Sequence, residues 1–254
     1  MSNITMESLR RLNVIAALLH AGQAVAVILL AKDYLIPVTT SYLTYNVASQ
    51  SLQPTTSQVF QVSLAWLTIS FLIMSSVAHL IIATVYRRRY EADLKRGINK
   101  ARWVEYAISA STMMVAIAFL SGIYDLSSLI MIFALVAIMN LMGLVMEVWN
   151  QKNKKVNWLS YAIGCIAGLA PWLVFVIYVM GAANYGSGQI PTFVYWIYVS
   201  IFIFFNSFAV NMFLQYRQIG RWKNYLYGER VYIVLSLVAK SALAWQVFAG
   251  TLRP

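Results

Sequence analysis

Four ionisable side chains lie inside long apolar stretches of the sequence, where charge is costly and marks a functional candidate. Lys240 is the deepest. It follows Arg230 by ten residues, which places it about 15 Å along a helix and near the middle of a bilayer. A lysine amine at that depth suits a covalent Schiff-base linkage. The alternative is a structural lysine that only pairs with a carboxylate.

Glu105 is the carboxylate best placed to meet that lysine. It stands three residues after Arg102 and enters the apolar region from the same side. Side chains lean toward the N-terminus of their helix, so the Lys240 side chain points toward Glu105. Ser236, one turn before Lys240, shares its helical face. The alternative for Glu105 is an interfacial carboxylate paired with Arg102.

The only two histidines of the chain complete this set. His20 lies nine residues beyond Arg11, and His79 lies eight residues before Arg87. Both are therefore about 12 to 13 Å deep, in the layer of the lysine and the glutamate. We expect a hydrated polar pocket at this level, although histidines in membranes also serve as plain packing residues.

These residues need a bundle of membrane helices to position them. The sequence is 61% hydrophobic and 11% charged, against about 25% charged in an average soluble domain. Seven transmembrane helices are predicted, at residues 10–31, 59–86, 101–122, 126–149, 157–180, 191–216 and 229–250. The expected fold is an all-α bundle forming a single domain over residues 1–254, in contact with membrane lipid.

The basic residues predict the orientation of this bundle. Sixteen of the nineteen Lys and Arg residues fall in the segments on one side of the membrane. By the positive-inside rule, the N-terminus is cytoplasmic and the C-terminus is extracellular. The net charge of +11 therefore reflects topology, and we predict no binding to nucleic acid. Residues 33–58 form the one long external loop, where alternation predicts a short β-hairpin or, equally, an irregular loop.

Two histidines and a single cysteine, Cys165, leave no metal site to predict. Aromatic and small side chains line the same bundle, among them Tyr106, Met139, Gly143 and Phe205. At helical spacing such residues more often form a plain core than a ligand cradle. Periodicity alone does not identify a ligand.

Four stretches of the chain resemble the heliorhodopsin family of retinal-binding microbial rhodopsins. They are RWVEYAISAS at 102–111, GCIAGLAPW at 164–172, FFNSFA at 204–209 and GERVYIVLSLVAKSALAWQ at 228–246. The likeness extends over essentially the whole chain, and the cytoplasmic N-terminus agrees with the inverted orientation of that family. It implies a multi-pass protein of a microbial cell membrane.

The resemblance also implies a role for each candidate residue. Lys240 would hold all-trans retinal as a Schiff base, with Glu105 as its counterion. The polar network around them would consist of His20, His79 and Ser236. The residues in contact with the polyene would be Tyr106, Met139, Gly143 and Phe205. The family forms homodimers, for which the external loop, Asp125 and Tyr178 are candidate contacts.

The distribution of acids favours a light sensor over a pump. A proton pump needs acids on both sides of the Schiff base, but residues 107–121 contain none, and the only outer candidate is Asp125. We therefore expect a non-enzymatic sensor that signals through its cytoplasmic loops to a partner. A light-driven proton transporter or channel is the alternative. A seven-helix zinc hydrolase is a further one, but it needs about three His ligands where this chain has two.

Overall fold

The structure, a computed structural model, describes residues 4–153, 155–186 and 190–254. Its helices are α1 (Met6–Leu30), α2 (Leu64–Ala83), α3 (Arg87–Lys95), α4 (Lys100–Leu120), α5 (Leu126–Trp149), α6 (Leu159–Tyr185), α7 (Thr192–Tyr216) and α8 (Tyr225–Val247). Two short helical segments are η1 (Gly220–Lys223) and η2 (Phe248–Leu252), and two strands are β1 (Leu35–Asn46) and β2 (Ser51–Ser63).

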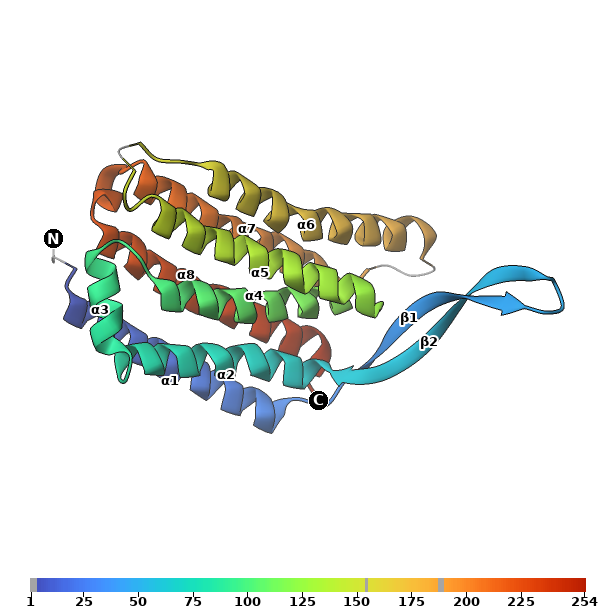
Figure 1. The fold of residues 1–254 in the computed structure, drawn as a ribbon. Coiled ribbons are helices and arrows are strands. Elements are labelled where there is room, and N and C mark those ends of the chain that lie inside the picture. The colour runs from blue at the N-terminus through green and yellow to red at the C-terminus, as the bar shows by residue number, and fades with distance from the viewer. Residues whose placement is uncertain (1–3, 154, 187–189) are drawn as a thin grey trace.

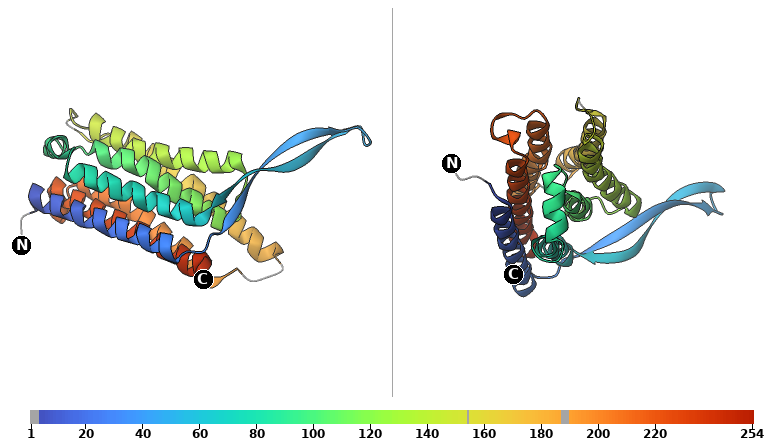
Figure 2. Two further views of the ribbon diagram at one scale, coloured as in Figure 1. Left: turned by 90° about the horizontal axis from the view of Figure 1, so that it is seen from below. Right: turned by 60° about the vertical axis from the view of Figure 1, so that its left-hand side comes forward.

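Seven of these helices are long and apolar enough to cross a membrane, namely all except α3, with α8 continuing through η2. They run side by side in one bundle, from whose end the β1–β2 hairpin projects, as Figure 1 and Figure 2 show. This confirms the predicted seven-helix bundle and the hairpin. The described N- and C-terminal residues lie at opposite ends of the bundle, as an odd number of spans requires (Figure 1).

The hairpin is longer than predicted, and the helix after it is shorter. Strand β2 continues to Ser63, so the helix expected over 59–86 begins at Leu64. Residues 60–63 alternate apolar and polar side chains, which is the period of a strand, whereas a hydropathy count over a longer window assigns them to the apolar run that follows. Thr39 also donates its backbone N–H to the Tyr124 carbonyl at 2.8 Å, which ties the hairpin to the α4–α5 turn.

Helix α3 was not among the predicted elements. It lies outside the seven spans and buries Tyr90, Asp93 and Leu94 against the bundle. Gly97, with a φ of +71°, then turns the chain toward α4, and the side chain of Asn99 caps α4 by accepting from the Arg102 N–H. This short helix places one buried tyrosine over the end of the bundle.

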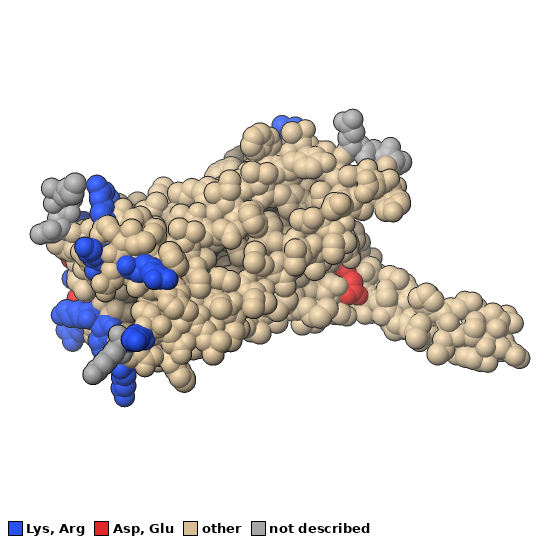
Figure 3. Space-filling view, turned by 90° about the horizontal axis from the view of Figure 1, so that it is seen from above, with Lys and Arg blue, Asp and Glu red and all other residues tan. Residues whose placement is uncertain are grey.

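The bundle has two chemically different ends. The basic end carries the N-terminus, α3, the α5–α6 connection and η1, and Lys and Arg side chains gather there in Figure 3. The hairpin end carries the hairpin and the C-terminus. Lys154, one of the counted basic residues, lies outside the described residues. The side of the membrane that each end faces stays a prediction from the charge distribution.

Most of the large apolar core lies toward the hairpin end. Its fully buried side chains include Phe71, Leu72, Ile117, Leu243 and Val247. A smaller core at the basic end contains Leu9, Ile82, Tyr90 and Ile233. The buried charged side chains and the two histidines lie between these two cores and at the basic end.

Candidate functional site

Lys240 and Glu105 form a buried ion pair in the middle of the bundle. The Lys240 Nζ donates to Glu105 Oε1 at 2.7 Å and to Ser236 Oγ at 3.1 Å. Ser75 on α2 donates a further bond to Glu105 Oε1 at 2.6 Å. Only 3% of the lysine side chain is exposed. The structure thus brings together the three residues that helical depth and direction had matched.

The two histidines stack against each other beside this pair. The ring centroids of His20 and His79 are 5.8 Å apart, with 13° between the planes. The imidazole of His79 donates from Nδ1 to Asn13 Oδ1 at 2.7 Å. Both ring nitrogens of His20 and Nε2 of His79 find no hydrogen-bond partner among the described residues. Buried polar atoms without a partner in the protein are commonly hydrogen-bonded to ordered water.

A second buried ion cluster lies nearer the basic end. Arg102 donates from Nη2 to Glu147 Oε1 at 2.5 Å and from Nη1 to Glu229 Oε2. The three side chains come from α4, α5 and α8, and none is more than 3% exposed. The Arg102 guanidinium also lies over the Tyr232 ring, 3.9 Å from its centroid. The alternative prediction, that Glu105 pairs with Arg102, is therefore wrong.

The sequence prediction did not single out Glu147 or Glu229. Both fall at the ends of predicted spans, where carboxylates commonly face water. The signal that could have found them is depth, because one arginine and two glutamates stand about one turn inside three apolar helices. Three charges at one level of a bundle have each other as the obvious partners.

A polar cavity with an empty volume of about 290 Å³ connects the two ion sites. Its walls include Glu105 at one end and Arg102 with Glu229 at the other, and His79 and Asn13 line its side. The polar layer therefore extends from the lysine toward the basic end.

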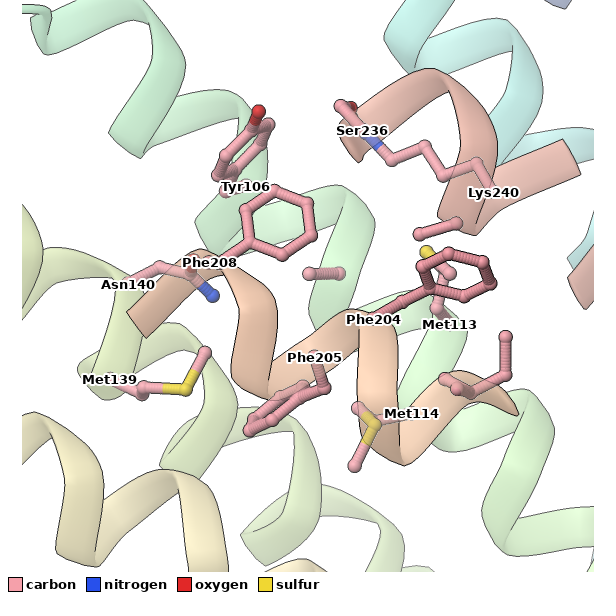
Figure 4. A pocket seen from close by; sticks show the side chains of 13 residues that line it. Tyr106, Met113, Met114, Met139, Asn140, Phe204, Phe205, Phe208, Ser236 and Lys240 are labelled. Atoms are coloured by element: carbon pink, nitrogen blue, oxygen red, sulfur yellow. The ribbon is translucent and has the colours of Figure 1, made fainter. Parts of the chain in front are cut away.

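An apolar cavity with an empty volume of about 550 Å³ opens on the other side of Lys240. Figure 4 shows its lining side chains, which come from α4, α5, α7 and α8. They are Tyr106, Ala110, Met113, Met114, Met139, Asn140, Ile201, Phe204, Phe205, Phe208, Ser236, Ala239 and Lys240. The wall of the cavity thus consists mainly of aromatic rings, thioethers and aliphatic side chains, with one lysine amine.

Gly143 lies in an adjoining cavity of about 880 Å³, which shares Met139, Asn140, Phe205 and Phe208 with the first. The Trp103 ring packs directly onto this glycine, so that a Cβ would come within 2.5 Å of it. A Cβ added to Gly168 on α6 would come equally close to the Met139 sulfur. Small residues here let two side chains approach a helix backbone.

The two candidate dimer contacts lie away from these cavities. The Asp125 side chain caps α5 by accepting from the Ser128 N–H at 2.9 Å. Tyr178 on α6 is 40% exposed on the surface of the bundle. Their contact with a second copy stays a prediction.

Comparison with known families decides the identity of the bundle. The sequence pattern of heliorhodopsins matches residues 9–252, nearly the whole chain. The chain belongs to the heliorhodopsin family. The comparison with curated proteins finds no match.

Two solved structures share this heliorhodopsin's fold. The light-driven proton pump LR (Mac) from Leptosphaeria maculans has 18% sequence identity and a TM-score of 0.61, covering 95% of this chain and 94% of that one. Cyanorhodopsin from the cyanobacterium Tolypothrix sp. NIES-4075 has 13% identity and a TM-score of 0.60, covering 99% of this chain and 96% of that one. At these identities the likeness is one of fold.

Membership of the family implies a retinal chromophore bound to a lysine, and the site fits that group. Lys240 is the one buried lysine of the described residues. Its amine stands at the wall of an apolar cavity lined by aromatic and methionine side chains, as an isoprenoid aldehyde would need. Tyr106, Met139 and Phe205 line that cavity. Gly143 lines the adjoining one.

Proposed function

We propose that this heliorhodopsin is a light sensor of the cell membrane, which signals to the cytoplasm without transporting ions. All-trans retinal on Lys240, as a protonated Schiff base, would supply the light absorption and the change of shape on isomerisation. The chain itself would supply a counterion, an apolar cavity and a path for conformational change. We assign the counterion to Glu105 and the surrounding polar network to Ser236, His20 and His79.

The observation that supports the absence of ion transport is the unequal polarity of the two halves of the bundle. From the Lys240–Glu105 pair to the basic end, buried polar groups and a polar cavity follow one another. Toward the hairpin end, the charged side chains of the described chain are confined to the rim, at Lys32, Asp33, Asp125 and Arg253. The interior between is filled by the large apolar core. Among the described residues, a proton crossing the membrane would have no carboxylate, histidine or lysine to occupy between the Lys240–Glu105 pair and that rim.

The residues around Lys240 explain how light would change the basic end. Glu105 at 2.7 Å stabilises a cation on the lysine nitrogen. Any displacement of that cation changes the attraction between α8 and α4, since each carries one partner. Ser75 links the same carboxylate to α2, so the change reaches three helices.

Light-dependent ion movement tests this proposal directly. Cells expressing the protein with retinal are illuminated in unbuffered medium, with and without a protonophore. We expect no pH change from the wild type or from Lys240→Ala, which serves as the matched control. A pH change that the protonophore abolishes, and that Lys240→Ala lacks, would establish the transporter alternative instead.

No observation favours a membrane hydrolase. Among residues 4–153, 155–186 and 190–254, no three His, Cys, Asp or Glu side chains are grouped to hold a metal ion. We therefore propose a non-enzymatic photoreceptor. Its output would act on a cytoplasmic partner through the loops at the basic end, where Arg88 and Arg89 on α3 are exposed.

We also propose that the protein is a homodimer. The hairpin exposes apolar side chains, including Leu43, Tyr45 and Val47, which a soluble extension rarely does without a partner. Cross-linking of purified protein in lipid, compared with a variant lacking residues 41–57, would test this. Loss of the dimer band on deletion supports the proposal, and a monomeric wild type rejects it.

A further inference from the structure

The cluster of Arg102, Glu147 and Glu229 contains two buried carboxylates and one cation. One of the two carboxylates therefore has no counterion of its own. Burying an unpaired carboxylate is costly, and two acids that share a site bind a proton more readily than one. The cluster is thus suited to take up a single proton.

Glu229 differs from Glu147 in its surroundings. Glu147 accepts four hydrogen bonds, from the Asn99 N–H at 2.8 Å, the Trp103 indole at 2.7 Å, the Tyr225 hydroxyl at 3.0 Å and Arg102. It does not line the polar cavity. Glu229 accepts three bonds and lines the cavity that Glu105 lines at the other end. A proton in the cavity therefore reaches Glu229 first.

Tyr90 gives Glu229 a hydrogen-bond partner that can change from donor to acceptor. Its hydroxyl donates to Glu229 Oε1 at 3.1 Å, while the amide of Asn13 donates to the hydroxyl at 3.5 Å. Asn99 Nδ2 and Arg102 only donate, but a tyrosine hydroxyl either donates or accepts. Burial, followed by the charge of Glu229, raises the pKa of Tyr90 well above its ordinary value, so the hydroxyl keeps its proton.

We propose that Glu229 is an internal proton store, which holds a proton released from the Lys240–Glu105 pair in the light and returns it in the dark. This rests on the proposed function. The proton leaves the lysine nitrogen beside Glu105, whose side chain lines the polar cavity. It crosses that cavity past His79 and binds Glu229 Oε1, whose O–H then donates to Tyr90. The return follows the same path, so no proton is exchanged with either side of the membrane.

Other titratable groups surround this position and compete for the proton. They are His79 on α2, Tyr90 on α3, Arg102, Glu105 and Tyr106 on α4, Glu147 on α5, Tyr216 on α7, and Tyr225 and Tyr232 on α8. The tyrosines and the arginine stay protonated near neutral pH. The competition therefore lies between Glu229, Glu147, Glu105 and the imidazole of His79.

Light-minus-dark infrared spectroscopy of the retinal-loaded protein distinguishes these groups. We expect a positive band of a protonated carboxyl group in wild type, retained but smaller in Glu147→Gln, absent in Glu229→Gln and shifted in Glu229→Asp. Glu229→Asp keeps a carboxyl group at this position, so a shifted band in this variant shows that the band depends on the acid and that the protein is folded. Persistence of an unshifted band in Glu229→Gln, its loss in Glu147→Gln alone, a negative band, or no carboxyl band would each overturn the proposal.

A titration of the retinal-free protein gives an independent readout. Followed by infrared absorption, one carboxyl group of the wild type should take up a proton on acidification, and Glu229→Gln should remove that signal. In Glu147→Gln, Arg102 pairs with Glu229 alone, so the protonation of Glu229 should move to lower pH. An unchanged titration in both variants would reject the store. Light-driven pH changes in cells would reject the sensor function itself. The failure of the proton store and the failure of the proposed function therefore give different results.

Discussion

Arg102 and Glu105 lie one turn apart on α4, yet they pair with different partners. Glu105 Oε1 accepts from Lys240 at 2.7 Å, whereas Arg102 binds the carboxylates of Glu147 and Glu229. Two separate ion sites are therefore stacked along one helix, with a polar cavity between them. A single turn of α4 therefore separates the two sites.

Lys240→Ala should abolish the covalent pigment, because the lysine is the one buried amine beside the apolar cavity. The measurement is the visible absorption of protein expressed with all-trans retinal, followed by bleaching with hydroxylamine in the light. Lys32→Ala, at the hairpin end, is the control and should absorb as wild type. A stable visible chromophore in Lys240→Ala would contradict the assignment.

Glu105→Gln should lower the pKa of the retinal Schiff base, because a carboxylate beside the Schiff base favours the protonated, charged form of that base. We expect the transition from the visible to the near-ultraviolet form to occur at a pH about 1 to 3 units lower. Spectra recorded across a pH series measure this. Glu7→Gln, at the partly exposed position of α1, should titrate as wild type. Equal titration of Glu105→Gln and wild type would mean that another group is the counterion.

Arg102→Met should destabilise the bundle, because it leaves Glu147 and Glu229 buried without a cation. Removal of one partner from a buried ion pair typically costs about 3 to 5 kcal/mol. The thermal midpoint of pigment loss in detergent, compared with the exposed-site variant Arg88→Met, gives the difference. Equal midpoints would show that the cluster contributes nothing to stability.

Gly168→Ala should perturb the chromophore cavity, since the new Cβ would come within 2.5 Å of the Met139 sulfur and 3.2 Å of the Phe205 ring. Overpacking of this kind costs about 1 to 3 kcal/mol. We expect a shifted absorption maximum and slower uptake of added retinal. The matched control is Gly181→Ala on the same helix, where no atom lies within 4 Å of the new Cβ. Identical spectra for the two variants would contradict the packing.

The orientation predicted from the basic residues can be measured with single cysteines in a Cys165→Ser background. A membrane-impermeant maleimide added to intact cells should label Val47→Cys at the hairpin tip and leave Arg88→Cys on α3 unlabelled. Both positions are exposed, so access and not burial decides the result. The opposite labelling pattern would reverse the topology.

Local regularities of the sequence were sufficient to predict the ion pair of Lys240 and Glu105. Helical rise places Lys240 near mid-depth and Glu105 nearer the basic end, and the lean of side chains along a helix points the lysine toward the glutamate. The same regularities placed Ser236 beside the lysine and both histidines in its layer. They did not predict the length of the hairpin, because residues 60–63, which alternate as a strand does, also adjoin the apolar run of the next helix and are counted with it.

The sequence alone determined that the chain crosses a membrane seven times, which end is basic, and which amine stands at mid-depth. These properties depend on length, hydropathy and spacing within single helices. Only the tertiary structure decided that Arg102 binds Glu147 and Glu229, residues 45 and 127 positions away. Which faces of α4, α5 and α8 meet is set by the packing of the whole bundle, since mean hydropathy does not specify the rotation of a helix about its axis.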